Sequence, residues 1–189
     1  MSKNIYCIIG NSGSGKTTVC DILEKDYGYK QIPSYTTRPK RNENEIGHTF
    51  VSDEEFDNLE HKVAYADYRG TKYCVTQEQI DNEDYSLYVV DVSGLNSLRK
   101  NYKGNRNIVS IYIYADAVTL HNRLTERYSY MSPEERIETV AKRLSDDLFE
   151  FRGARKLCDY CVVNDSMPVD YCVNRIKKII EEDDASEKC

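Results

Sequence analysis

An eight-residue stretch near the N-terminus constrains the fold of this chain more than any other feature. The sequence GNSGSGKT, from Gly10 to Thr17, follows the apolar run IYCII at positions 5–9 and precedes a helical pattern. It matches the template G-x-x-x-x-G-K-[ST], whose glycines let consecutive backbone N–H groups point at phosphate oxygens. The positive end of the following helix strengthens this attraction for anions. The stretch therefore predicts a strand, a phosphate-binding loop and a helix in succession.

The side chains of this loop predict a nucleotide site. Lys16 is expected to neutralise the β and γ phosphate oxygens, and the Thr17 hydroxyl to ligate a Mg²⁺ ion that bridges them. The alternative is a glycine-rich turn that binds nothing, and the position of the motif directly after a strand argues against it. The residues of this segment expected to bind ATP are Gly10, Asn11, Ser12, Gly13, Ser14, Gly15, Lys16, Thr17 and Thr18.

The composition is typical of a single α/β domain. With 189 residues, 40% of them hydrophobic, the chain can form one well-filled core with small inserted lobes, but not two full domains. The net charge of −6 gives no attraction toward nucleic acid, so nucleotide substrates are expected as partners and DNA or RNA is not. There is no apolar run of membrane-spanning length and no signal peptide, so we expect no membrane association and a cytoplasmic location. The chain is expected to be a monomer or a homodimer.

Seven cysteines, most of them within apolar patterns, are expected to be reduced thiols that pack as small hydrophobic residues. Cys158 and Cys161 form a C-x-x-C pair. A zinc site would need a second pair or histidines at matching spacing, and none follows. The pair therefore does not predict a structural metal site.

Alternating strand and helix patterns predict a parallel sheet covered by helices on both faces. Its strands are expected at 4–9, 29–32, 86–90, 108–114 and 160–163. Helices are expected at 17–27, at 117–127, after the capping sequence SPEE at 132–135 and at 169–180, with a frayed tail beyond. Ligands of such sheets collect at the carboxyl ends of the strands, where the glycine-rich loop, Asp91 and Asn164 lie.

Residues 34–80 are expected to form a small insertion with antiparallel character. The segment PSYTTRPKR at 33–41 is predicted as a loop whose hydroxyls and cations can hold an anion, and 41–49 as irregular. Ser52 and Glu55 form a capping box for a helix that reaches about Glu60. The runs 63–68 and 72–75 predict a β-hairpin.

The residues after the glycine-rich loop resemble those of the guanylate kinase family. The family grips the acceptor phosphate with S-x-T-T-R-x-x-R, matched here by Ser34, Thr36, Thr37, Arg38 and Arg41. Further matches are Gly47, FVS-x-EEF at 50–56, Ala66, G-x-x-Y at 70–73, DV-x-G at 91–94, RL-x-x-R at 123–127, KRL at 142–144 and VVND at 162–165. The resemblance covers nearly the whole chain. It implies a P-loop NTPase-like α/β fold, in which a parallel sheet flanked by helices carries a small inserted acceptor-binding lobe and a helical lid.

The resemblance also implies boundaries and an activity. The core would comprise 1–33, 81–124 and 146–189 of a single domain, the acceptor lobe 34–80 and the lid 125–145. The activity would be ATP-dependent transfer of a phosphoryl group to a nucleoside monophosphate, with GMP as the expected acceptor. Such a transfer needs positioning and cations around the migrating group, and a guanidinium fork can meet two phosphate oxygens at once.

The resemblance assigns roles to particular residues. The catalytic residues would be Lys16, Arg38, Arg127 and Arg143. The acceptor would be bound by Ser34, Thr37, Arg38, Arg41, His48, Tyr73 and Asp91. Arg123 and Asn164 would add to the ATP site, and Thr17 and Asp91 would serve Mg²⁺.

Three of these assignments have simpler alternatives. Arg123 and Arg127 lie four residues apart on one helix face, which could be a solvated basic surface. Asp91 would hold Mg²⁺ through water or contact the acceptor, or else be an ordinary residue at a strand end. Asn164 matches the adenine-side loop of the family, yet Asn-Asp is also a common turn pair.

The positions that read guanine depart from the family pattern. The family has a glutamate where this chain has Ala64, and a serine or threonine where it has Val75. A phosphate-contacting tyrosine is replaced by His48, and the second aspartate of a D-x-D motif by Ser93. Because a carboxylate accepts from the ring N–H and amino group of guanine, its loss can cost orders of magnitude in selectivity.

Three hypotheses follow from these departures. The chain is a divergent guanylate kinase that reads the base with other groups, such as Glu60, or Asp67 after a bulge or register shift. Alternatively, it acts on another acceptor, either a different nucleoside monophosphate or ribose 1,5-bisphosphate. A third hypothesis is a non-catalytic phosphopeptide-binding module, against which the intact glycine-rich loop and the lid arginines argue.

Overall fold

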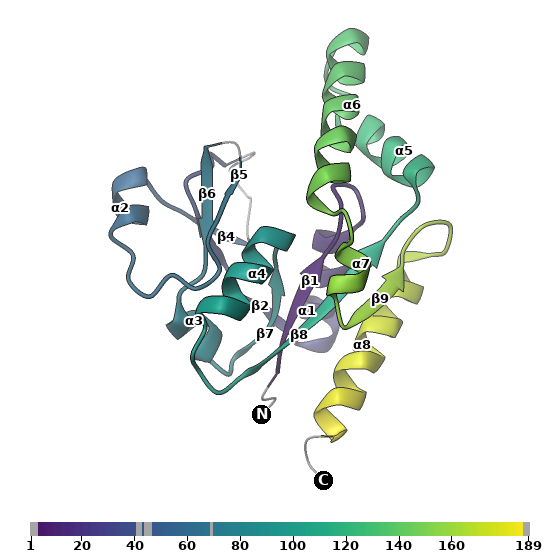
Figure 1. Ribbon diagram of the computed structural model, residues 1–189. Coiled ribbons are helices and arrows are strands. Elements are labelled where there is room, and N and C mark those ends of the chain that lie inside the picture. The colour runs from purple at the N-terminus through teal and green to yellow at the C-terminus, as the bar shows by residue number, and fades with distance from the viewer. Residues whose placement is uncertain (1–3, 41–42, 44–46, 69, 187–189) are drawn as a thin grey trace.

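A parallel five-stranded sheet forms the centre of the protein (Figure 1). The computed structural model describes residues 4–40, 43, 47–68 and 70–186. The sheet has the strand order β2-β7-β1-β8-β9. These strands are β1 (Asn4–Ile9), β2 (Lys30–Gln31), β7 (Tyr85–Val89), β8 (Asn107–Tyr114) and β9 (Tyr160–Val163). All of their pairings are parallel, so their carboxyl ends meet at one edge, as predicted.

Helices connect the strands of this sheet. In chain order they are α1 (Lys16–Tyr27), α2 (Asp53–Asp57), α3 (Gln77–Asp81), α4 (Val92–Asn101), α5 (Ala117–Arg127), α6 (Pro133–Glu150), α7 (Ala154–Leu157) and α8 (Val169–Ser186). The central sheet is covered by α4 on one face and by α1 and α8 on the other. In Figure 1, α6 extends well beyond the sheet, with α5 beside it. None of the helices in the described part of the chain is long and apolar enough to cross a membrane.

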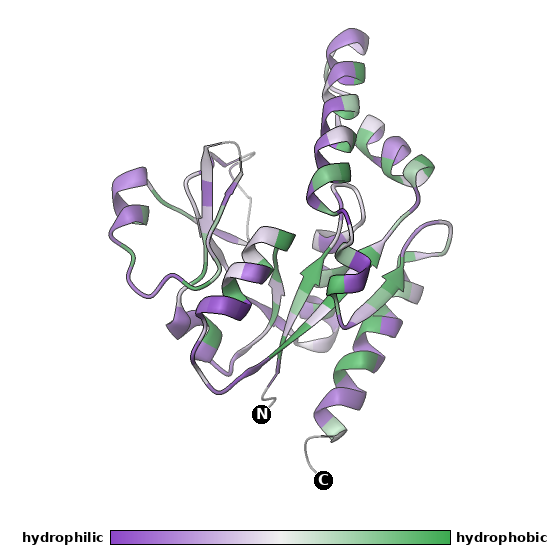
Figure 2. Cartoon of the chain, in the orientation of Figure 1, coloured by the Kyte–Doolittle hydropathy of each residue, from purple (hydrophilic) through white to green (hydrophobic). Residues whose placement is uncertain are grey.

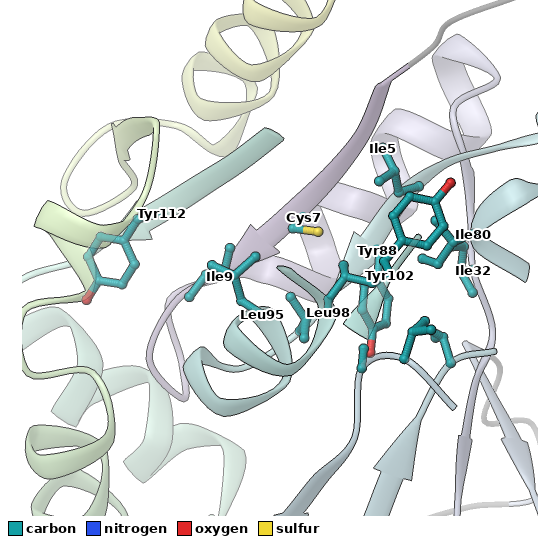
Figure 3. Packing of buried hydrophobic residues seen from close by; sticks show 14 of the residues in the cluster. Ile5, Cys7, Ile9, Ile32, Ile80, Tyr88, Leu95, Leu98, Tyr102 and Tyr112 are labelled. Carbon is teal, nitrogen blue, oxygen red and sulfur yellow. The ribbon is translucent and has the colours of Figure 1, made fainter. Parts of the chain in front are cut away.

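Side chains that alternate along β1 build the two halves of the core. Ile5, Cys7 and Ile9 are fully buried and pack in one cluster with Leu95 and Leu98 of α4 (Figure 3). The intervening side chains of β1 lie in a second cluster, on the face covered by α1 and α8. Figure 2 shows the same arrangement, with the central strands hydrophobic and the outer helices mixed. Since every residue of β1 is buried, the loop that follows it starts from a rigid base.

A second sheet of four strands forms the insertion. Its order is β4-β3-β6-β5, with β3 (Ser34–Thr36), β4 (His48–Phe50), β5 (Ala66–Tyr68) and β6 (Thr71–Cys74). The expected hairpin is confirmed as β5 and β6, which pair antiparallel. The strands β3 and β4 pair in parallel, so the insertion is a mixed sheet.

The segments predicted as a loop and as irregular structure each contain a strand. Residues 34–36 form β3, with Thr36 fully buried, and residues 48–50 form β4. Both predictions missed these strands because each strand forms by pairing with a segment that is distant in the sequence. Ser34 lies opposite His48, and Thr36 lies opposite Tyr73.

Two helix ends also differ from the prediction. The helix α2 ends at Asp57 and not near Glu60, because the ammonium group of Lys62 donates to carbonyls of its last turn, at 3.0 Å for Phe56 and 2.9 Å for Asp57. The predicted frayed tail is helical up to Ser186. Ion pairs between residues 177 and 181 and between 178 and 182, each one helical turn apart, support this extension.

The helices α3, α4 and α7 were not predicted. The helix α4 follows directly on β7, and Asp91 caps its first turn. The other predicted strands and helices of the core are confirmed, including α6, which begins with the capping box of Ser132 and Glu135 and with Pro133 in its first turn.

The buried side chain of Arg106 joins the insertion to the sheet, and its loss should destabilise the fold. Its guanidinium group donates to the backbone carbonyls of Asn4, Ile80, Asn82 and Tyr85, at 2.5–3.0 Å. Replacing Arg106 with Ala leaves these carbonyls without their partner, so we expect urea denaturation to show a free energy of unfolding lower by about 3–5 kcal/mol. The exposed Arg155 is the matched control, and Arg155→Ala should change stability by less than about 0.5 kcal/mol. Equal stabilities of the two variants would contradict this role of Arg106.

Candidate active site

The glycine-rich loop joins β1 to α1 in a conformation that requires glycine. Gly13 and Gly15 have φ angles of 82° and 95°, in the left-handed region that side chains disfavour. A Cβ atom at Gly15 would also collide with the amide nitrogen of Asn164. The loop can therefore approach Asn164 closely only because Gly15 has no side chain.

Lys16 lies across the loop. Its ammonium group donates to the backbone carbonyl of Gly10 and, at 3.1 Å, to that of Asn11. Burial lowers the pKa of Lys16 to about 8. The hydroxyl-bearing side chains of Thr17 and Thr18, which follow it, are exposed at the start of α1.

Asn164 and Arg123 hold the loop from the other side. The Nδ2 atom of Asn164 donates to the carbonyl of Ser14 at 2.8 Å. The guanidinium group of Arg123 donates to the carbonyl of Gly13 at 3.2 Å and to that of Asn164 at 2.9 Å. Both residues thus lie at the loop, as the sequence predicted for an ATP site, and here they contact its backbone.

Two cavities border the loop. The first, of about 620 Å³, is called the loop cavity, and its lining includes Gly13, Gly15, Thr17, Thr18, Arg123, Arg127 and Asn164. The second, of about 200 Å³, is called the lobe cavity and lies between the sheet and the insertion. Its lining includes Ser34, Ala64, Ala66, Tyr73, Asp91, Arg143, Asp147 and Glu150. Ser12, Lys16 and His48 line both cavities, so the two meet at these residues.

Residues of the insertion give the lobe cavity its polar wall. The Ser34 hydroxyl and the Nδ1 atom of His48 are hydrogen-bonded at 2.8 Å, a contact set by the parallel pairing of β3 and β4. The ring of His48 also meets that of Tyr73 edge-on, with centroids 6.0 Å apart. The structure therefore brings together three of the residues predicted to bind the acceptor.

The other predicted acceptor residues of the insertion lie elsewhere. Thr37 ties the end of β3 to β6, because its hydroxyl accepts from the backbone N–H of Lys72 at 3.1 Å. The guanidinium group of Arg38 donates to the carbonyl of Pro39 at 2.9 Å and lies over the ring of Phe50. Neither is among the residues that line the two cavities. Arg41 lies outside the described residues.

Asp91 lies at the carboxyl end of β7 and borders the lobe cavity. Its Oδ1 atom accepts from the backbone N–H of Gly94 at 2.5 Å, so it caps α4. Burial raises the pKa of this carboxyl group. Thr17, the other residue predicted to serve Mg²⁺, borders the loop cavity instead. Within the residues that the structure describes, no group of three or more His, Cys, Asp or Glu side chains is placed to hold a metal ion.

The helix α6 brings one predicted and two unpredicted charged residues to the lobe cavity. Arg143, Asp147 and Glu150 all line it and are spaced four and three residues apart, which places them on one face of the helix. Burial raises the pKa of Glu150 to about 7, and the nearby carboxylates of Asp91 and Asp147 add to this effect. The same helical spacing relative to Arg143 could have identified the two acids from the sequence.

The chain is similar to known guanylate kinases along nearly all of its length. A family model described as guanylate kinase matches residues 2–183. The guanylate kinase of Clostridium tetani is 31% identical, over 100% of this chain and 89% of that protein. The guanylate kinase of Campylobacter jejuni strain RM1221 is 30% identical, over 90% of this chain and 85% of that protein.

A solved structure is similar in fold. The crystal structure of the guanylate kinase from Anaplasma phagocytophilum superposes with a TM-score of 0.61 at 20% sequence identity. The match covers 97% of this chain and 88% of that one. At this identity the comparison supports the α/β fold and its inserted sheet.

The raised pKa of Glu150 predicts a pH dependence of stability. The folded chain keeps the proton of Glu150 up to about pH 7, whereas the ordinary value is 4.5. Between these pH values the folded state binds more protons than the unfolded state. The contribution of Glu150 to the free energy of unfolding is therefore lost as the pH rises. Glu150→Gln should therefore raise the melting temperature relative to wild type more at about pH 8 than at about pH 4.5. Glu138→Gln, at an exposed site on the same helix, is the control and should show no such pH-dependent difference.

Proposed function

Because the chain belongs to the guanylate kinase family, we propose that it transfers the terminal phosphoryl group of ATP to a nucleoside monophosphate, with GMP as the acceptor and GDP and ADP as the products. The observation that carries this proposal is the meeting of the two cavities at Ser12, Lys16 and His48. A donor in the loop cavity and an acceptor in the lobe cavity would point their phosphates at this junction. Such an arrangement provides the positioning that phosphoryl transfer needs.

The donor would be held by the backbone N–H groups of the glycine-rich loop and by Lys16. Gly15 precedes α1 and provides no side-chain cap, so the first N–H groups of this helix are available to phosphate oxygens. The ammonium group of Lys16, which now contacts the loop carbonyls, is within the same loop and can turn to the phosphates. Arg127 borders the loop cavity and would add positive charge there.

The residues of the loop fit a Mg²⁺ ion. The Thr17 side chain is exposed at the loop cavity and offers a hydroxyl oxygen, a ligand type that Mg²⁺ accepts. Asp91 offers a carboxylate in the neighbouring lobe cavity, where it can contact the ion through water or meet the acceptor. When bound, Mg²⁺ would neutralise part of the negative charge of the phosphates.

The acceptor phosphate would bind to the polar wall formed by Ser34, His48 and Tyr73. These side chains line the lobe cavity, as Lys16 does. Arg38 would have to turn from Phe50 to reach this wall, and Arg143 already borders the cavity. The division into a core, an acceptor lobe and a lid stays a prediction, and so do the cytoplasmic location and the oligomeric state.

Apolar side chains on another part of the lobe cavity wall favour a second class of acceptor. Ala64 and Ala66 line the lobe cavity with exposed fractions of 1% and 4%, and Val75 beside them is fully buried. None of these side chains can hydrogen-bond a base. Asp67, considered as a substitute, accepts instead from the backbone N–H of Gly70 in the hairpin turn. Another nucleoside monophosphate or ribose 1,5-bisphosphate would therefore suit the wall as well as GMP does.

Replacing Lys16 tests the donor site. Lys16→Ala should lower the kcat for ADP release with GMP roughly a hundredfold or more, because a charge that stabilises the transferring phosphoryl group is lost. Its melting temperature should stay within about 3 °C of wild type, since burial already disfavours the charged ammonium group. Lys25→Ala, at an exposed position on the same helix, is the control and should retain full activity. Retained activity in Lys16→Ala would contradict the assignment.

A comparison of acceptors tests how the base is read. GMP and IMP differ in the amino group that a carboxylate would recognise. Because Ala64, Ala66 and Val75 offer no carboxylate, we expect the kcat/KM values of the two nucleotides to lie within about tenfold of each other. AMP and ribose 1,5-bisphosphate complete the panel. Ala64→Glu places a carboxylate in the cavity wall and should increase the preference for GMP over IMP. A wild-type preference for GMP of about a thousandfold or more would show that another group reads the amino group.

A further inference from the structure

The carboxylate of Asp147 holds the glycine-rich loop at a backbone N–H group. Its Oδ2 atom accepts from the N–H of Ser12 at 2.5 Å, and its Oδ1 atom accepts from the Ser12 hydroxyl at 3.4 Å. Asp147 is only 2% exposed, so this contact is shielded from water. Figure 1 shows the lower end of α6, which carries Asp147, beside the loop that follows β1.

This contact differs in kind from the other side-chain contacts of the loop. Lys16, Arg123 and Asn164 all donate to loop carbonyls. Asp147 instead places an anion on an N–H group, the type of partner that a phosphate oxygen provides. Because Ser12 lies where the loop cavity meets the lobe cavity, the carboxylate occupies the place toward which the last phosphate of a donor would extend.

We infer that Asp147 is a positioning residue that competes with the terminal phosphate of the donor for the Ser12 N–H group. The inference rests on the proposed function of the loop as the donor site. A buried carboxylate and a phosphate cannot share this N–H group, since like charges at such a distance repel strongly out of water. A triphosphate therefore binds only after Asp147 has moved away from Ser12, whereas the phosphates of a diphosphate do not extend as far as this N–H group.

The departure of Asp147 has a consequence for the rest of α6. Arg143 lies one helical turn before Asp147 on the same face. A shift of the helix that removes the carboxylate from Ser12 also moves this guanidinium group relative to the junction. Binding of the donor is thereby coupled to the position of Arg143, which is predicted to act in the transfer.

The contact itself can be tested without nucleotide. In the full-length chain, the ¹⁵N-labelled amide of Ser12 should give a strongly downfield proton resonance, because it donates to a charged acceptor over a short distance. Asp147→Asn should move this resonance upfield, and Glu138→Gln, which removes an exposed charge from the same helix, should not. An unchanged Ser12 resonance in Asp147→Asn would overturn the inference.

The competition between Asp147 and the terminal phosphate is tested by calorimetric titration of the same variants with two nucleotides. One is Mg²⁺-ADP. The other is the Mg²⁺ complex of an ATP analogue that has nitrogen between the β and γ phosphorus atoms. Asp147→Asn should bind the triphosphate about tenfold or more tightly than wild type does, and the diphosphate with little change. Glu138→Gln should match wild type with both.

The outcomes separate the inference from the proposed function. Equal changes for the two nucleotides, or weaker binding of the triphosphate, would show that Asp147 merely shapes the loop and would overturn the inference while the donor site stands. If neither wild type nor Asp147→Asn binds either nucleotide, the proposed function fails, and the inference fails with it.

Discussion

The uncapped start of α1 is the constraint on which the site depends. Side chains cap the first turns of α2 to α6, and these caps are Ser52, Thr76, Asp91, Asp116 and Ser132. The helix α1 follows Gly15, which has no side chain that could accept a hydrogen bond. Its first N–H groups are left for an anion from outside the helix. An uncapped helix start that borders the loop cavity is suited to binding phosphate there.

The surroundings of the loop preserve this open state. Lys16, Arg123 and Asn164 each donate to a carbonyl oxygen of the loop. These contacts hold the loop by its carbonyl oxygens. If the loop binds a nucleotide as proposed, Arg123 and Asn164 would serve that site by shaping the loop.

The sequence predicted the parts of the protein that depend on local patterns. The glycine-rich loop, the capping box of Ser132 and the strands with continuous apolar runs are set by neighbouring residues, and the structure confirms them as elements. The contact between Ser34 and His48 depends on pairing across an insertion, so only its members could be named in advance. Asp147 was missed because its role arises from a contact between residues 135 positions apart.

The charges around the junction include several that belong to α6. Lys16 and Arg143 line the lobe cavity together with three acids, Asp91, Asp147 and Glu150. Nucleotide phosphates would add negative charge to a place where acids already lie beside the cations. Asp91 is tied to α4 as its cap, whereas the other two acids belong to α6. Asp147 and Glu150 are therefore on the same helix as Arg143, so a movement of this one helix would change the charge around the junction.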